Sequence, residues 1–157
     1  MGKAMSALRL KPAAVSGFWF DYEEPTGDPL AAAHPDHTCF LVARFNNRSY
    51  REKFHRLLAQ RAPMLPRASD LPESRAARQV AYESMARAVT AESMVGTVLL
   101  GWSNLLGDDK QQLQFTDAAA ITILSDPAFD EVANFIIELA RGVDGIWQEA
   151  TEAAAGN

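Results

Sequence analysis

The sequence predicts an α+β protein that is predominantly α-helical, with a small N-terminal β-hairpin packed on about four helices. Two observations predict this class: short aromatic and apolar segments near the start are typical of strands, and later segments repeat apolar residues at helical spacing. The chain has 157 residues, of which 48% are hydrophobic and 22% charged. This length suits one domain, and this composition disfavours disordered and collagen-like chains.

The predicted hairpin pairs Phe18 to Tyr22 with Cys39 to Phe45. Residues 23–37 between these strands hold three prolines and one glycine, which predict a long, mobile connecting loop. Residues 1–16 show no period and are predicted to form a flexible arm.

A first helix is predicted over residues 49–61, because Tyr50, Phe54 and Leu57 fall on one helical face. Residues 46–49 supply a turn and an N-cap signal before it, and Pro63 and Pro66 follow it as helix-ending residues.

A second helix is predicted to begin near Pro72 and to continue to Leu100, with Gly96 as its weak point and Gly101 as its end. Trp102 is then interpreted as an aromatic residue that closes the core at the helix terminus. Residues 103–113 are predicted to form a polar, hairpin-like loop.

The C-terminal part predicts two more helices. Thr116 caps a short helix that runs through Leu124, and Asp126 followed by Pro127 opens a long one. The long helix carries an apolar stripe that is predicted to be buried: Phe129, Val132, Ile136 and Leu139, continued by Val143 and Ile146, with Phe135 and Trp147 at its margins. Residues 148–157 are predicted to fray, which leaves 17–147 as a single globular domain.

Several classes of protein are disfavoured by simple features of the chain. No apolar run is long enough for a membrane-spanning helix, and the N-terminus lacks the apolar core of a secretory signal. The single cysteine, Cys39, cannot form an internal disulfide. We therefore expect a cytoplasmic protein that does not contact a membrane.

The formal net charge of −5 hides two segments of opposite sign. Residues 44–67 hold seven basic residues and one acidic residue, a net of +6, whereas residues 108–157 hold two basic and ten acidic residues, a net of −8. Such a charge distribution favours head-to-tail contacts between copies or steers a charged partner, and it is also what two solvated helix faces look like.

His34, His37 and Cys39 form the one grouping of soft metal ligands in the chain. Their spacing matches no structural zinc signature, so we expect no metal and no cofactor. Cys39 opens an apolar strand, where a small buried hydrophobe is a simpler interpretation than a nucleophile. The chain also carries no phosphate-binding glycine loop and none of the common hydrolase motifs, and we expect a protein that is not an enzyme.

The predicted helix 48–61 carries Arg48, Arg51 and Arg56 near two aromatic residues, a pattern that also suits a nucleic-acid backbone. The acidic pI of about 5.2 makes nucleic acid the less favoured partner.

An ordered series of short motifs in the second half resembles a known family. Residues 98–110 read VLLGWSNLLGDDK, followed by LQFT at 113–116 and by spaced apolar residues up to Ile136. This series resembles the tail assembly chaperones of long-tailed bacteriophages and prophages. The segment FNNRSY at 45–50 is similar to the Asn-Pro-x-Tyr element of that family, although Arg48 and Ser49 replace the proline and the residue after it. The resemblance covers about residues 38–140.

The resemblance implies a non-enzymatic assembly factor that coats the helical tape-measure protein and brings tail-tube subunits to it. It implies a protein of the host cytoplasm that is absent from the mature virion, and the family often makes a longer frameshifted form. We expect Arg48, Arg51 and Arg56 to lie at a protein interface, including contacts between copies, and Trp102, Phe129 and Ile136 to act as structural anchors.

Two other classes stay open. One is a small head-tail or regulatory protein that contacts nucleic acid through the basic helix. The other is a metal-dependent hydrolase that uses His34, His37 and Cys39.

Overall fold

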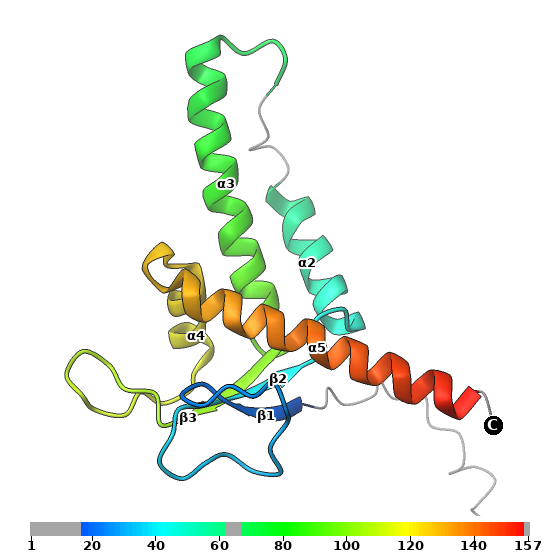
Figure 1. Cartoon of the computed structure of the whole chain (residues 1–157). Helices are drawn as coiled ribbons and strands as arrows, with labels where there is room; N and C mark the ends of the chain where they lie inside the picture. The colour runs from blue at the N-terminus through cyan, green and yellow to red at the C-terminus, as the bar shows by residue number, and fades with distance from the viewer. Residues whose placement is uncertain (1–16, 62–66, 156–157) are drawn as a thin grey trace, which may run out of the picture.

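The structure is a computed structural model that describes residues 17–61 and 67–155, with side chains up to Gly145. Figure 1 shows the elements in chain order: β1 Gly17–Asp21, β2 Cys39–Ala43, α2 Arg48–Arg61, α3 Pro72–Met94, β3 Leu99–Ser103, α4 Asp117–Ser125, the 3₁₀ turn η2 Pro127–Phe129, and α5 Asp130–Ala155. The predicted α+β class and the predominance of helix are confirmed. The predicted arm (1–16) and the prolines after α2 lie outside the described residues, and α5 extends through most of the segment 148–157.

The three strands form an antiparallel sheet in the order β1-β2-β3. Phe20 pairs with Phe40, which pairs on its other side with Trp102, so three aromatic residues form one cross-strand row. All three belong to the buried core, together with residues of α3, α4 and α5. The predicted hairpin is therefore present, and a third strand extends it.

The predicted helix from Pro72 to Leu100 is wrong in its last turn and a half, because α3 ends at Met94. Gly96 takes a positive φ of 82°, which lets the chain reverse, and its N–H donates to the Leu99 carbonyl at 2.9 Å. The following residues enter β3, so Trp102 lies within a strand rather than at a helix end. A short buried apolar run has no period that separates a strand from a helix, which explains the error.

The junction between β2 and α2 depends on the Asn47 side chain. Its Oδ1 accepts from the Tyr50 N–H at 2.8 Å and caps the helix, and its Nδ2 donates to the carbonyls of Arg44 and Thr97 at 2.8 and 2.7 Å. Asn47 is buried, so these bonds fasten the start of α2 to the turn after α3.

The predicted caps of the last two helices are confirmed. Thr116 Oγ1 accepts from the Ala119 N–H at 3.1 Å, and Asp126 Oδ1 accepts from the Ala128 N–H at 2.9 Å. Ile136 is fully buried, as predicted, but Phe129 is 42% exposed, which corrects its assignment as a buried anchor. Phe129 lies in η2, the turn that precedes α5, so it does not continue the buried face of that helix.

The helices form two regions that differ in burial. In Figure 1, α5 crosses the sheet, while α2 and α3 lie side by side and project away from it. The buried residues of α3 all lie between Met85 and Met94, and none lies in residues 72–84. None of the helices in the described ranges has the length and apolar character needed to cross a membrane.

Candidate partner-binding surfaces

The exposed face of α2 carries the three arginines that the sequence places at an interface. The Arg48 side chain is 84% exposed and its Nε donates to Glu52 Oε1 at 2.7 Å, a hydrogen bond that raises the pKa of Arg48. Arg51 and Arg56 are exposed, and no ion pair within the described residues involves them. Arg48, Arg51, Glu52 and His55 line a shallow hollow on this face. We call this surface the basic face.

The other cations of α2 serve its packing. Lys53 Nζ donates to the Val95 carbonyl at 3.1 Å, at the C-terminal end of α3, and Arg61 pairs with Glu92 of α3 at 2.7 Å. A cation near a helix C-terminus is stabilised by the partial negative charge there. The structure thus divides the basic segment into residues that hold α2 against α3 and residues that face outward.

The basic and acidic segments also meet within the chain. Arg44 Nε lies 3.2 Å from Asp144 Oδ1 of α5, and Asp144 Oδ2 accepts from the Asn46 N–H at 2.9 Å. Part of the charge separation that the sequence shows is therefore compensated inside one molecule, and the basic face is what remains available to a partner.

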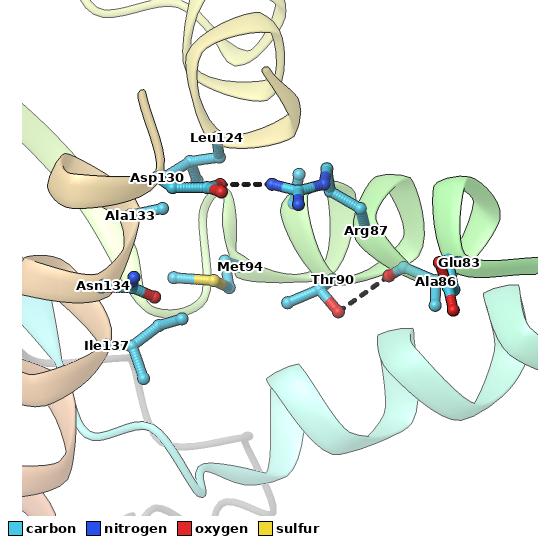
Figure 2. A pocket seen from close by; sticks show the side chains of 11 residues that line it. Glu83, Ala86, Arg87, Thr90, Met94, Leu124, Asp130, Ala133, Asn134 and Ile137 are labelled. Atoms are coloured by element: carbon cyan, nitrogen blue, oxygen red, sulfur yellow. Dashed lines mark hydrogen bonds and ion pairs between the residues drawn. The ribbon is translucent and has the colours of Figure 1, made fainter. Parts of the chain in front are cut away.

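A cleft lies where α3, α4 and α5 converge, and no sequence pattern predicted it. Figure 2 shows its lining, which encloses a volume of about 290 Å³. Met94, Leu124 and Ala91 are buried beneath it, and half-buried Ile137 and Ala133 of α5 form one wall. An ion pair between Arg87 and Asp130 bridges α3 and the start of α5. The α3 residues of the cleft are 30 or more positions from those of α4 and α5, so no local motif could reveal the cleft.

His34, His37 and Cys39 lie close together, but among the described residues their side-chain ligand atoms do not form a metal-binding group. Cys39 is fully buried, and burial raises the pKa of its thiol, which disfavours the thiolate form. Its Sγ accepts from the His34 N–H at 3.3 Å. The interpretation of Cys39 as a small buried hydrophobe is confirmed.

His37 instead pairs with a carboxylate at the end of β1. Its Nδ1 lies 2.7 Å from Asp21 Oδ2, and this hydrogen bond raises the pKa of His37 and lowers the pKa of Asp21. The His34 ring stacks on His37 with centroids 3.7 Å apart.

Asp21, Glu23 and His37 bring one potential metal ligand each within 4.8 Å of one another. These atoms already have protein partners, however, because Asp21 also accepts from two backbone N–H groups and Glu23 accepts from the Thr38 N–H. The group is a network of hydrogen bonds that folds the turn, and the absence of a bound metal stays a prediction.

Asn104, the residue after β3, completes this network. It has a positive φ of 56°, and its Nδ2 lies within hydrogen-bond distance of three carbonyls, those of His34, Pro35 and His37. Asparagine is among the non-glycine residues that adopt this backbone conformation most readily. An asparagine directly after a strand could have indicated a turn at this position, but no sequence pattern links Asn104 to the distant turn at residues 34–37.

The buried anchors belong to the fold. Trp102 Nε1 donates to the Leu113 carbonyl at 2.7 Å, and its ring meets Phe115 edge-on at 4.8 Å. Trp102 therefore holds the loop 104–116 against the sheet, which agrees with a structural role.

Together, the fold and these surfaces define a small α+β protein whose exposed helix faces and interhelical cleft suit contacts with other macromolecules. Residues 45–157 match the family model of the YdaY prophage protein, and the chain belongs to that family. It is thus a phage or prophage protein. Neither a curated protein nor a solved structure matches the chain.

Proposed function

We propose that this prophage protein is a non-enzymatic tail assembly chaperone that binds the tape-measure protein and recruits tail-tube subunits. The observation that carries the proposal is the projecting pair of helices, in which α2 presents the basic face and the first half of α3 has no buried residue. A tape-measure protein is a long helix with apolar stripes, and such stripes need reversible cover until the tail tube surrounds them.

The segment on which the resemblance rests supports the proposal indirectly. Residues 98–116 form β3 and the loop that Trp102 holds down, so their role is to maintain the fold. In an assembly factor the fold positions the binding surfaces, and those surfaces lie on helices.

Self-association is part of the proposal. Arg51 and Arg56 have no ion pair in the described ranges, while α5 carries the exposed acidic residues Glu131 and Glu138, the latter paired with Arg141. Copies that line up along a client would bring the basic face of one copy toward α5 of the next. The protein acts in the host cytoplasm and is absent from the finished particle.

The test is co-expression of the chain with the tape-measure and tail-tube proteins of the same prophage. Wild-type protein should co-purify with both and keep the tape-measure protein in solution, and mass spectrometry of finished particles should not detect it. Failure to bind either protein, when both are expressed and folded, would exclude the chaperone function.

Charge reversal then tests the basic face. Replacing Arg48, Arg51 and Arg56 with Glu should weaken self-association or co-purification, and more so at low salt than at high salt. The control replaces Arg67 and Lys110, two exposed cations outside α2, α3 and α5, with Glu.

The alternative function is contact with nucleic acid through the same helix. The exposed arginines favour it, but Tyr50 is buried and stacked with half-buried Phe54, which leaves neither ring free to stack on bases. If the Arg-to-Glu protein keeps every protein partner and loses DNA or RNA binding that the wild type shows, the nucleic-acid function replaces the chaperone function.

A further inference from the structure

The cleft between α3, α4 and α5 has the dimensions and chemistry of an anchor pocket. Its volume of about 290 Å³ is at or below the lower limit for small-molecule pockets, which is about 300 Å³, and suits one large apolar side chain. The buried side chains of Met94 and Leu124 provide an apolar base, and polar groups stand at the rim. An apolar centre within a polar rim is the arrangement that binds hot-spot residues in protein interfaces.

The cleft continues along α3 as an extended contact path. Val80, Glu83, Arg87, Thr90 and Met94 lie within an arc of about 80° on this helix, at about 100° per residue. The path is about 21 Å long, at 1.5 Å per residue. Its outer end is the Val80 side chain, which is 66% exposed. An occupant that follows this path has the length of about four helical turns, which a small molecule does not have.

The charges beside this path are acidic. Glu83 is exposed and accepts a hydrogen bond from the neutral Gln79 side chain at 3.3 Å, whereas Arg87 is compensated by Asp130. Arg87 is the one cation among the described residues that line the cleft, and it is paired with Asp130. The complementary ligand therefore carries positive charge beside its apolar side chain.

We propose that this cleft binds an amphipathic α-helix of a protein partner, which inserts one large apolar side chain between α3 and α5 and places a basic residue beside Glu83. That this helix comes from the tape-measure protein rests on the proposed function. That the cleft prefers a basic amphipathic helix rests on its lining alone. The interaction is of the helix-in-groove kind, with anchors spaced three, four and seven residues apart.

A defined peptide tests the preference directly. The probe is a fluorescein-labelled 18-residue peptide of Leu, Ala and Lys with its leucines on one helical face. Fluorescence anisotropy should show binding of this peptide by the full-length protein. A peptide of the same composition with the leucines scattered, and one with Glu in place of Lys, should each bind at least about tenfold more weakly.

Two variants locate the binding site. Ala133→Trp places a large ring in the cleft and should weaken binding of the Lys peptide by at least about tenfold, since it occupies the anchor position. Glu83→Lys should weaken binding about two- to fivefold, the range expected for loss of one exposed charge contact. Asp108→Lys makes the same change of charge at an exposed position in the loop after β3, outside the lining of the cleft, and should leave binding unchanged.

The outcomes separate folding from recognition. Glu83 is exposed, so Glu83→Lys should retain the circular dichroism spectrum and thermal midpoint of the wild type even if Ala133→Trp does not. Equal binding of the Lys and Glu peptides, or full binding by a folded Ala133→Trp protein, would overturn the inference.

Comparison with the tape-measure experiment separates the two proposals. Peptide binding at the cleft without co-purification of the tape-measure protein would leave the cleft inference standing and remove the chaperone function. If the tape-measure protein still co-purifies with the Ala133→Trp variant and the wild type binds no peptide, the chaperone function stands and the cleft inference is excluded.

Discussion

The two halves of α3 share many residue types, although the second half is more apolar, and they have opposite environments. Residues 72–84 and 85–94 both mix alanine, glutamate, arginine and one or more larger apolar residues, yet all the buried residues lie in the second half. The second half packs against the sheet, α4 and α5 and is also the part that α2 contacts, whereas the first half extends beyond the end of α2 (Figure 1). Burial here is decided by what the rest of the chain places next to the helix, and the exposed half is available to partners.

The largest expected effect comes from truncating the buried half. Met94→Ala removes a fully buried side chain that contributes to the core and to the base of the cleft, and should lower the free energy of unfolding by about 2–5 kcal/mol. Val80→Ala on the exposed half should change it by less than about 0.5 kcal/mol. Chemical denaturation measures both, and equal costs would show that the first half is also covered.

Ile136→Ala tests the contrast between buried and exposed positions in α5 and the turn before it. Ile136 is fully buried, so the expected cost is about 2–5 kcal/mol, whereas Phe129→Ala should cost less because Phe129 is partly exposed. A cost below about 0.5 kcal/mol at Ile136 would indicate a binding face rather than a core position.

Asn47→Ala tests how the buried half is fastened to α2. The change removes a helix cap and leaves the carbonyls of Arg44 and Thr97 without these donors, and should cost about 2–3 kcal/mol. Asn46→Ala, at an exposed neighbouring position, is the matched control. Thermal unfolding of both variants measures the difference, and similar midpoints would exclude this role of Asn47.

The ion pair between Asp21 and His37, which lies away from α3, makes a smaller contribution to folding stability, and this contribution depends on pH. The raised pKa of His37 gives stability that is complete below its ordinary value of 6.5 and is lost as the pH rises through the raised pKa. The lowered pKa of Asp21 gives stability that is present above its ordinary value of 3.8 and is lost as the pH falls through the lowered pKa.

The pair should therefore stabilise most between pH 3.8 and 6.5. His37→Gln should lower the thermal midpoint in this window, and the difference from wild type should shrink toward pH 9. His55→Gln, on the exposed side of α2, is the control. A difference that does not depend on pH would show that the ion pair is unimportant.

The smallest effect is expected at Ser93 in the buried half of α3. Its hydroxyl is buried and has no hydrogen-bond partner within the described residues. Ser93→Ala should be neutral or stabilise the protein by up to about 1 kcal/mol, because it removes an unpaired polar group. Thr97→Ala should instead destabilise it, since the Thr97 hydroxyl donates to the carbonyls of Ser93 and Met94. Calorimetry distinguishes these opposite signs.

The sequence was enough to predict the helix caps and the first strand, because interactions between residues close in the chain determine them. Thr116 and Asp126 cap helices because their side chains reach backbone N–H groups two or three residues away, and the aromatic segment after Gly17 forms a strand as its composition indicates. Arg48 and Arg56 are exposed because they lie opposite the apolar face of α2, whereas Arg51 is exposed at the edge of that face.

Only the tertiary structure decided the features that depend on distant neighbours. β3 forms because the chain reverses at Gly96 and pairs with β2 more than fifty residues earlier, and Phe129 is exposed because a 3₁₀ turn precedes α5. The cleft exists because α3 and α5 meet beside Met94 and Ala133 (Figure 2). The period of a sequence describes one element at a time, whereas a strand partner, an exposed ring and a cleft each require the relative placement of two or more elements.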